Sequence, residues 1–172
     1  MLSLSRTSGY AISALARLAG PGGVWTLAKD IASSAEIPKA YLSTILNALA
    51  RNGLINAKRG YRGGFALAKP AEKISVFRVV EAVEGHAWRN GCLLGLSQCS
   101  DERACPSHVF WKTQRKKIEQ FLRSLTLAQV AEFENRHQAQ LLRSAGARDG
   151  RMKPRRGWKP LRRTAPTRRK GR

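Results

Sequence analysis

Residues 54–68 read LINAKRGYRGGFALA, two short apolar runs separated by a basic, glycine-rich turn. Runs of this length joined by a turn that contains glycine are typical of a β-hairpin. Pro70 then ends the second run, because proline cannot donate a hydrogen bond to a neighbouring strand. The stretch therefore predicts a small antiparallel hairpin whose tip carries positive charge.

Three helices are expected before this hairpin. Apolar residues recur on one face between residues 11 and 19, and the Gly-Pro-Gly-Gly run at 20–23 ends that helix. Thr26 is expected to cap a second helix, and Pro38 suits the first turn of a third. The third helix has an apolar stripe before Gly53, formed by Leu42, Ile45, Leu46 and Leu49. Three helices followed by a basic hairpin predict a winged helix-turn-helix, mainly α-helical with a small β-hairpin wing.

The opposite face of the third helix is polar. A helix of this kind fits the major groove of double-stranded DNA, where short polar side chains reach base edges, and a basic wing reaches phosphates or the minor groove. The expected DNA-binding residues are Lys39, Tyr41, Ser43, Thr44 and Asn47 on the helix, and Arg59, Tyr61 and Arg62 in the wing. Taken singly, each element is also compatible with an ordinary surface helix and an ordinary hairpin.

The three cysteines of the chain lie close together in the sequence. Cys92, Cys99, Cys105 and His108 have the spacing C-x6-C-x5-C-x2-H, in a polar loop that precedes a long helical pattern. Three thiolates and one imidazole can complete a four-ligand shell for an iron–sulfur cluster or for zinc. The alternative is three reduced structural cysteines and a histidine at a helix start. We expect a metal site, because small buried cysteines are rarely gathered in a polar loop.

The remaining chain suggests an association helix and a basic tail. From residue 107 an apolar stripe continues for about five helical turns, and Thr126 with Gln129 resembles a capping box that starts a last helix. This stripe predicts a homodimer, although the helix could also fold back on its own domain. The expected parts are 1–84, the DNA-binding domain; 85–108, the metal-binding loop; 106–143, the dimerisation and C-terminal helices; and 144–172, a disordered basic tail.

Charge and hydropathy limit the function. The formal net charge is +21 and the isoelectric point is about 11.3, which predicts binding to nucleic acid. Residues 143–172 hold 13 Lys and Arg against one acid, a local charge of +12 that would add DNA affinity without specificity. No apolar run is long enough for a membrane span and no signal peptide is recognised, so a cytoplasmic protein is expected. No catalytic motif or small-molecule substrate site is apparent, and we expect no enzyme.

Residues 2–140 resemble a known family. The features are Ser8-Gly9-Tyr10-Ala11, Tyr41-Leu42 with Ile45-Leu46, the wing at 59–65 and the cysteine loop. The chain is similar to the IscR/NsrR-type family of bacterial iron–sulfur winged-helix transcriptional regulators, and most similar to its Cys3His branch. The resemblance implies a repressor that binds a palindromic operator as a homodimer and responds to iron, redox state or nitric oxide. It implies a 2Fe–2S cluster, with 4Fe–4S as the other possibility.

Two features depart from the pattern of that family. The gap between Cys92 and Cys99 is one residue longer than in the IscR-like members. Residues 7–9, Thr-Ser-Gly, hold no carboxylate where NsrR-like members take a fourth ligand from the other subunit, which favours His108 as the fourth ligand here. The competing function is a zinc-stabilised, nonspecific nucleic-acid-binding or architectural protein.

Overall fold

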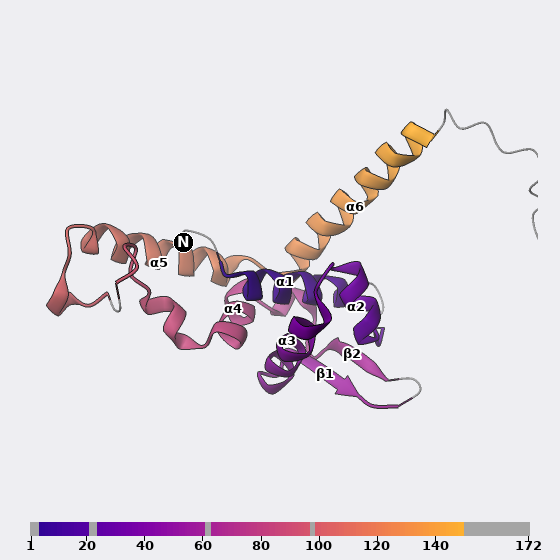
Figure 1. Cartoon of the computed structure of the whole chain (residues 1–172), viewed down its shortest axis with the longest axis horizontal. Helices are drawn as coiled ribbons and strands as arrows, with labels where there is room; N and C mark the ends of the chain where they lie inside the picture. Colours follow the sequence, from indigo (N-terminus) through magenta and orange to yellow (C-terminus); the bar gives the residue numbers. More distant parts are fainter. Residues whose placement is uncertain (1–3, 21–23, 61–62, 97–98, 150–172) are drawn as a thin grey trace, which may run out of the picture. The chain divides into compact units, whose positions relative to one another are not determined.

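The computed structural model describes residues 4–20, 24–60, 63–96 and 99–149, the last nine of them by their backbone alone. The fold is mainly α-helical with one two-stranded antiparallel hairpin, as the sequence predicts (Figure 1). Its first half contains α1 (Arg6–Leu18), α2 (Ala28–Ser34), α3 (Lys39–Arg51), β1 (Ile55–Lys58) and β2 (Gly64–Leu67).

Helix α3 is anchored by its apolar stripe. Leu42, Ile45, Leu46 and Leu49 are at most 3% exposed and pack with α1, α2 and β1 in the main hydrophobic core. The helix ends at Arg51 with Asn52 as its C-cap, and Gly53 follows with a left-handed φ of 66°, as expected for a glycine stop. Burial of one face fixes the rotation of α3, and its polar face is therefore turned outward.

A third short segment, around Thr26, pairs with the hairpin, and the sequence did not reveal this pairing. In the hairpin itself, Ile55 pairs with Leu67 and Lys58 with Gly64. Thr26 and Phe65 then exchange two backbone hydrogen bonds, of 2.9 and 2.8 Å. The prediction that Thr26 caps α2 is wrong, because this pairing places Thr26 beside β2, and α2 begins two residues later without a side-chain cap.

The second half contains α4 (Val76–Glu84), the 3-10 turns η2 (His86–Asn90) and η3 (Asp101–Arg103), α5 (His108–Ser124) and α6 (Leu127–Asp149). The predicted capping box before α6 is present, since Gln129 N–H donates to Thr126 Oγ1 and Thr126 N–H donates to Gln129 Oε1. Helix α6 ends at Asp149 and so includes the first residues of the expected basic tail, 144–149. Most of that tail, residues 150–172, lies outside the described residues.

A small second cluster joins α4 to α5. Val76, Phe77 and Val80 of α4 pack with Leu122 of α5. At the end of this helix pair, Ser75 and Thr126 form an isolated antiparallel β-bridge. Contacts divide the chain into residues 1–137 and 138–172. Among helices in the part that the structure describes, none is long and apolar enough to cross a bilayer.

Candidate nucleic-acid interface and cysteine loop

The polar face of α3 is exposed along its length. Five predicted DNA-binding residues lie on it, all exposed: Lys39, Tyr41, Ser43, Thr44 and Asn47. Tyr41 also contacts Tyr10 of α1, with ring centroids 6.1 Å apart, and this contact restricts the Tyr41 ring while leaving it 55% exposed. The structure thus brings the five residues together on one solvent-facing surface.

A groove of about 410 Å³ lies between α2, α3 and β2. Its lining includes Lys39, Ser43 and Asn47 from α3 and Lys29 from α2. Lys29 is an exposed cation that the sequence analysis did not select. The only sequence feature that pointed to Lys29 was its position on the helix before the expected DNA-binding helix. That feature could not show that α2 and α3 line the same groove.

In the wing, Arg59 is exposed to solvent, and Gly64 lies close to the Thr26 backbone. A Cβ atom on Gly64, whose φ is 143°, would lie 2.5 Å from the Thr26 carbonyl oxygen. A side chain there would therefore separate β2 from the Thr26 segment. Tyr61 and Arg62, the other two predicted wing residues, lie outside the described residues.

The cysteine loop brings its candidate ligands together in pairs. Cys99 Sγ lies 3.3 Å from His108 Nδ1, and His108, the first residue of α5, is only 5% exposed. Cys92, Cys99 and Cys105 are free and half-buried. The Cys92 side chain makes a minor contribution to the lowered pKa of the Cys105 thiol. Of the four predicted ligands, Cys99 and His108 are thus in direct contact.

A carboxylate that the sequence analysis missed completes the surroundings of His108. Asp101 Oδ1 lies 2.8 Å from His108 Nε2, and Lys112 Nζ lies 2.6 and 2.8 Å from the two Asp101 oxygens. The hydrogen bond from Lys112 is the main cause of a lowered pKa at Asp101, followed by the hydrogen bond with His108. The seven-residue separation of Asp101 from His108 gave no signal, because the intervening chain is irregular.

The Cys105 thiol has a second polar neighbour. The Ser107 hydroxyl, with Oγ 3.2 Å from Cys105 Sγ, lowers the pKa of the thiol, and the Ser107 backbone N–H acts in the same direction. A lowered thiol pKa favours the thiolate, which is the form of cysteine that binds metals.

The donor set fits a thiolate-bound metal centre in its chemistry. Three thiols and one buried imidazole are the ligand types of zinc and iron–sulfur sites. Asp101 on the second nitrogen of His108 is the outer partner that metal-binding histidines usually have. In the described part of the chain, no three His, Cys, Asp or Glu side chains converge on one point. A metal centre on all four residues would therefore require these side chains to move closer together.

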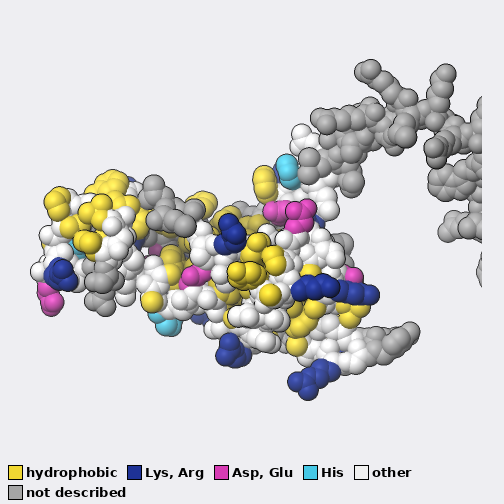
Figure 2. Space-filling model, in the orientation of Figure 1, with side chains coloured by type: hydrophobic (Ala, Val, Ile, Leu, Met, Phe, Trp, Pro, Cys, Tyr) yellow, Lys and Arg dark blue, Asp and Glu magenta, His cyan; other side chains and the backbone are white. Residues whose placement is uncertain are grey.

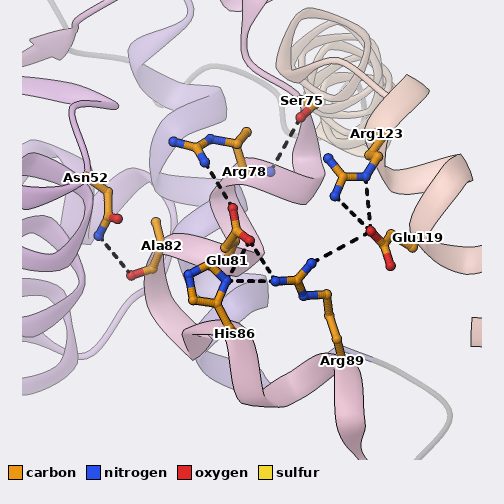
Figure 3. Close-up of polar contacts among 9 residues, drawn as sticks. All are labelled: Asn52, Ser75, Arg78, Glu81, Ala82, His86, Arg89, Glu119 and Arg123. Carbon is orange, nitrogen blue, oxygen red and sulfur yellow. Dashed lines mark hydrogen bonds and ion pairs between the residues drawn. The ribbon is translucent and has the colours of Figure 1, made fainter.

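A charged network connects the start of this loop to both neighbouring helices (Figure 3). Glu81 of α4 contacts Arg78, His86 and Arg89 at 3.0, 2.9 and 3.4 Å, so His86 is a partner of Glu81 and no part of the cysteine site. Arg89 and Arg123 both contact Glu119 of α5, and the Arg123 guanidinium lies 3.6 Å from the centre of the Phe77 ring. The network positions η2, which leads into the cysteine loop.

Helix α5 presents large apolar side chains to solvent. Val109, Phe110 and Phe121 are 76%, 60% and 61% exposed, whereas Leu122 is the one apolar side chain of the helix that is buried. Figure 2 shows hydrophobic side chains gathered over the end of α5 next to the cysteine loop. The expected apolar stripe thus exists, and its larger part is not covered by the described part of the chain.

Comparisons with known proteins agree on the class of protein. The Rrf2 family model, described as an iron-dependent transcriptional regulator, matches residues 4–132. The transcriptional regulator IscR of Yersinia pestis is 30% identical over 136 residues, covering 78% of this chain and 82% of that protein. The structure of T. potens IscR has a TM-score of 0.59 and 27% identity, over 81% of this chain and 91% of that one. CymR, the global cysteine regulator of B. subtilis, has the same fold at 23% identity and a TM-score of 0.63, over 77% and 98%.

Proposed function

The chain belongs to the Rrf2 family of iron-dependent transcriptional regulators, and we propose that it is a repressor whose operator affinity depends on an iron–sulfur cluster. Cys92, Cys99, Cys105 and His108 would hold this cluster, with 2Fe–2S favoured over 4Fe–4S. The relatives named above are transcriptional regulators and not enzymes. The proposal therefore concerns which signal this transcriptional regulator responds to.

The observation that carries the proposal is the environment of His108. A buried imidazole lies against a thiol of the cysteine loop, at the first residue of the helix that follows that loop. When bound, an iron–sulfur cluster supplies a centre that oxidants, iron shortage or nitric oxide can alter. Because His108 belongs to α5, a change in its ligation acts on the start of that helix.

A homodimer on a palindromic operator is the second part of the proposal. The uncovered apolar face of α5 supports a second subunit as its partner, because a monomer would leave Val109, Phe110 and Phe121 in water. A two-fold dimer would place two copies of α3 in successive major grooves, about 34–36 Å apart. The exposed residues of α3 and Arg59 in the wing would then face the DNA.

Anaerobic purification followed by iron, zinc and sulfide analysis tests the cluster. We expect a brown protein with visible absorption that is lost in Cys92→Ala, Cys99→Ala and Cys105→Ala. His108→Ala should leave the cluster labile, whereas His86→Ala, which removes a histidine bound to Glu81, should leave it unchanged. A colourless wild-type protein with stoichiometric zinc would instead support the zinc-stabilised nucleic-acid-binding protein.

Binding to an enriched DNA site and to a scrambled duplex tests whether the exposed face of α3 contacts bases. A site is first enriched from random DNA with the wild-type protein. If Thr44 and Asn47 contact bases, Thr44→Ala and Asn47→Ala should each cost about 1–3 kcal/mol on that site and little on the scrambled duplex. Arg59→Ala should weaken both complexes similarly if Arg59 contacts phosphate alone. Equal losses on both duplexes for every α3 variant would rule out sequence-specific reading by this helix.

A further inference from the structure

The two ring nitrogens of His108 have different kinds of partner. Nε2 lies 2.8 Å from the Asp101 carboxylate, and Nδ1 lies 3.3 Å from the Cys99 sulfur. An ionised carboxylate can only accept a hydrogen bond, so the nitrogen facing it must carry a proton. In a neutral imidazole the other nitrogen then has the free lone pair. The contacts therefore place that lone pair on Nδ1, toward the cysteine loop.

Asp101 is itself held in place by the same helix. Lys112 Nζ contacts both of its oxygens, at 2.6 and 2.8 Å. Lys112 lies four residues after His108, so the two side chains are neighbours on one face of α5. Although the Asp101 side chain is 74% exposed, both oxygens are engaged by α5. The carboxylate thus links η3 to the first two turns of α5.

We infer that Asp101 is a positioning residue for His108: its carboxylate accepts a hydrogen bond from Nε2–H and thereby directs Nδ1 toward the metal centre, and Lys112 holds the carboxylate in place. The inference rests on the proposed function in one respect, because it assumes that His108 is a ligand. Outer carboxylates of this kind fix the orientation of a histidine and increase its basicity, and their loss typically weakens metal binding about 10–100-fold. A ligand bond through Nε2 would require the contact with Asp101 to break.

Nitrogen NMR of the full-length, metal-free chain tests the tautomer directly. His86→Gln and His137→Gln in the background leave His108 as the only histidine. We expect the Nε2–H form to predominate in this protein and in Glu102→Ala, which removes the neighbouring carboxylate of η3 as a matched control. Asp101→Ala should give a mixture of the two tautomers. A predominant Nδ1–H form in the parent protein would overturn the inference.

Anaerobic titration of the same metal-free chains with Co²⁺ tests the consequence for binding. Asp101→Ala should weaken Co²⁺ binding about 10–100-fold. Asp101→Asn, which keeps an acceptor without the charge, should have a smaller effect, and Glu102→Ala should stay within about twofold of the wild type. An Asp101→Ala protein that binds Co²⁺ as tightly as the Glu102→Ala control would also overturn the inference.

In the protein that contains the cluster, ¹⁵N labelling of one ring nitrogen of histidine distinguishes the role of Asp101 from the ligand role of His108. With the label at Nδ1 alone, pulsed EPR of the reduced cluster should detect strong hyperfine coupling from the labelled nitrogen. Strong coupling only with the label at Nε2 would overturn the inference while leaving His108 as a ligand. A wild-type protein without any cluster would refute the proposed function. The tautomer and Co²⁺ results would still decide the role of Asp101.

Discussion

The winged helix-turn-helix unit (residues 11–83) and the cysteine loop (residues 85–107) are stabilised by different forces. The helices and the hairpin between residues 11 and 83 contain most of the buried apolar side chains, whereas none of the described residues between 85 and 107 is buried. The loop is held by donors from α5: Trp111 Nε1 donates to Gly91 O at 2.7 Å, and Arg115 Nη1 donates to Arg89 O at 2.6 Å. A region that lacks a core depends on a few polar contacts, so it can open locally without unfolding the winged unit.

The largest expected difference between the two regions is in the cost of removing apolar side chains. Phe77 is 1% exposed and packs between Trp88 and Arg123, so Phe77→Ala should lower the free energy of unfolding by about 3–5 kcal/mol. Leu96 in the loop is 56% exposed, and Leu96→Ala should change it by less than about 0.5 kcal/mol. Urea unfolding of the metal-free chains measures both values. Comparable losses for the two variants would mean that the loop has an apolar core of its own.

Two Gly→Ala substitutions, one in the hairpin and one in the cysteine loop, compare the same two regions at the backbone. Gly64 and Gly95 both have positive φ, of 143° and 75°, but only the Gly64 position is crowded, by the Thr26 backbone. Gly64→Ala should therefore cost about 2–4 kcal/mol in unfolding free energy, from strain and overlap together. Gly95→Ala meets nothing within 4 Å and should cost about 1–2 kcal/mol from strain alone. Thermal and urea unfolding distinguish these values, and a larger loss at Gly95 would contradict the described packing.

The smallest expected effect is a shift in the titration of Cys105. Since Ser107 lowers the pKa of this thiol, the folded metal-free chain should form the Cys105 thiolate at a lower pH than the unfolded chain. The stabilisation from this contact is present above the unfolded pKa and is lost as the pH falls through the folded one. Alkylation rates of Cys105 against pH, followed by mass spectrometry, measure the midpoint. Ser107→Ala should raise the midpoint and Ser100→Ala should not; an unchanged profile in Ser107→Ala would refute the assigned cause.

Sequence patterns predicted those helices in which apolar side chains are buried at helical spacing. The stripe from Leu42 to Leu49 determined both the core side and the exposed side of α3, because helical spacing relates the two directly. The prediction for Thr26 failed because its pairing partner, Phe65, is distant in the sequence. Asp101 and Lys29 were missed for a related reason: each acquires its neighbours only when separate segments fold together. The cysteine spacing suggested a metal site, but it could not show which side chains form pairs in the loop.

The β-bridge between Ser75 and Thr126 has a consequence for insertions and deletions. Val76 N–H donates to Leu125 O and Leu127 N–H donates to Ile74 O, each at 2.8 Å, and these bonds close the base of the α4–α5 pair. The cysteine loop is the tip of that closed pair, and a tip can change length while the base stays paired. By the entropy of loop closure, one added residue in the gap between Cys92 and Cys99 costs only about 0.1 kcal/mol. The spacing of the cysteines can therefore change while the exposed polar face of α3 stays unaltered.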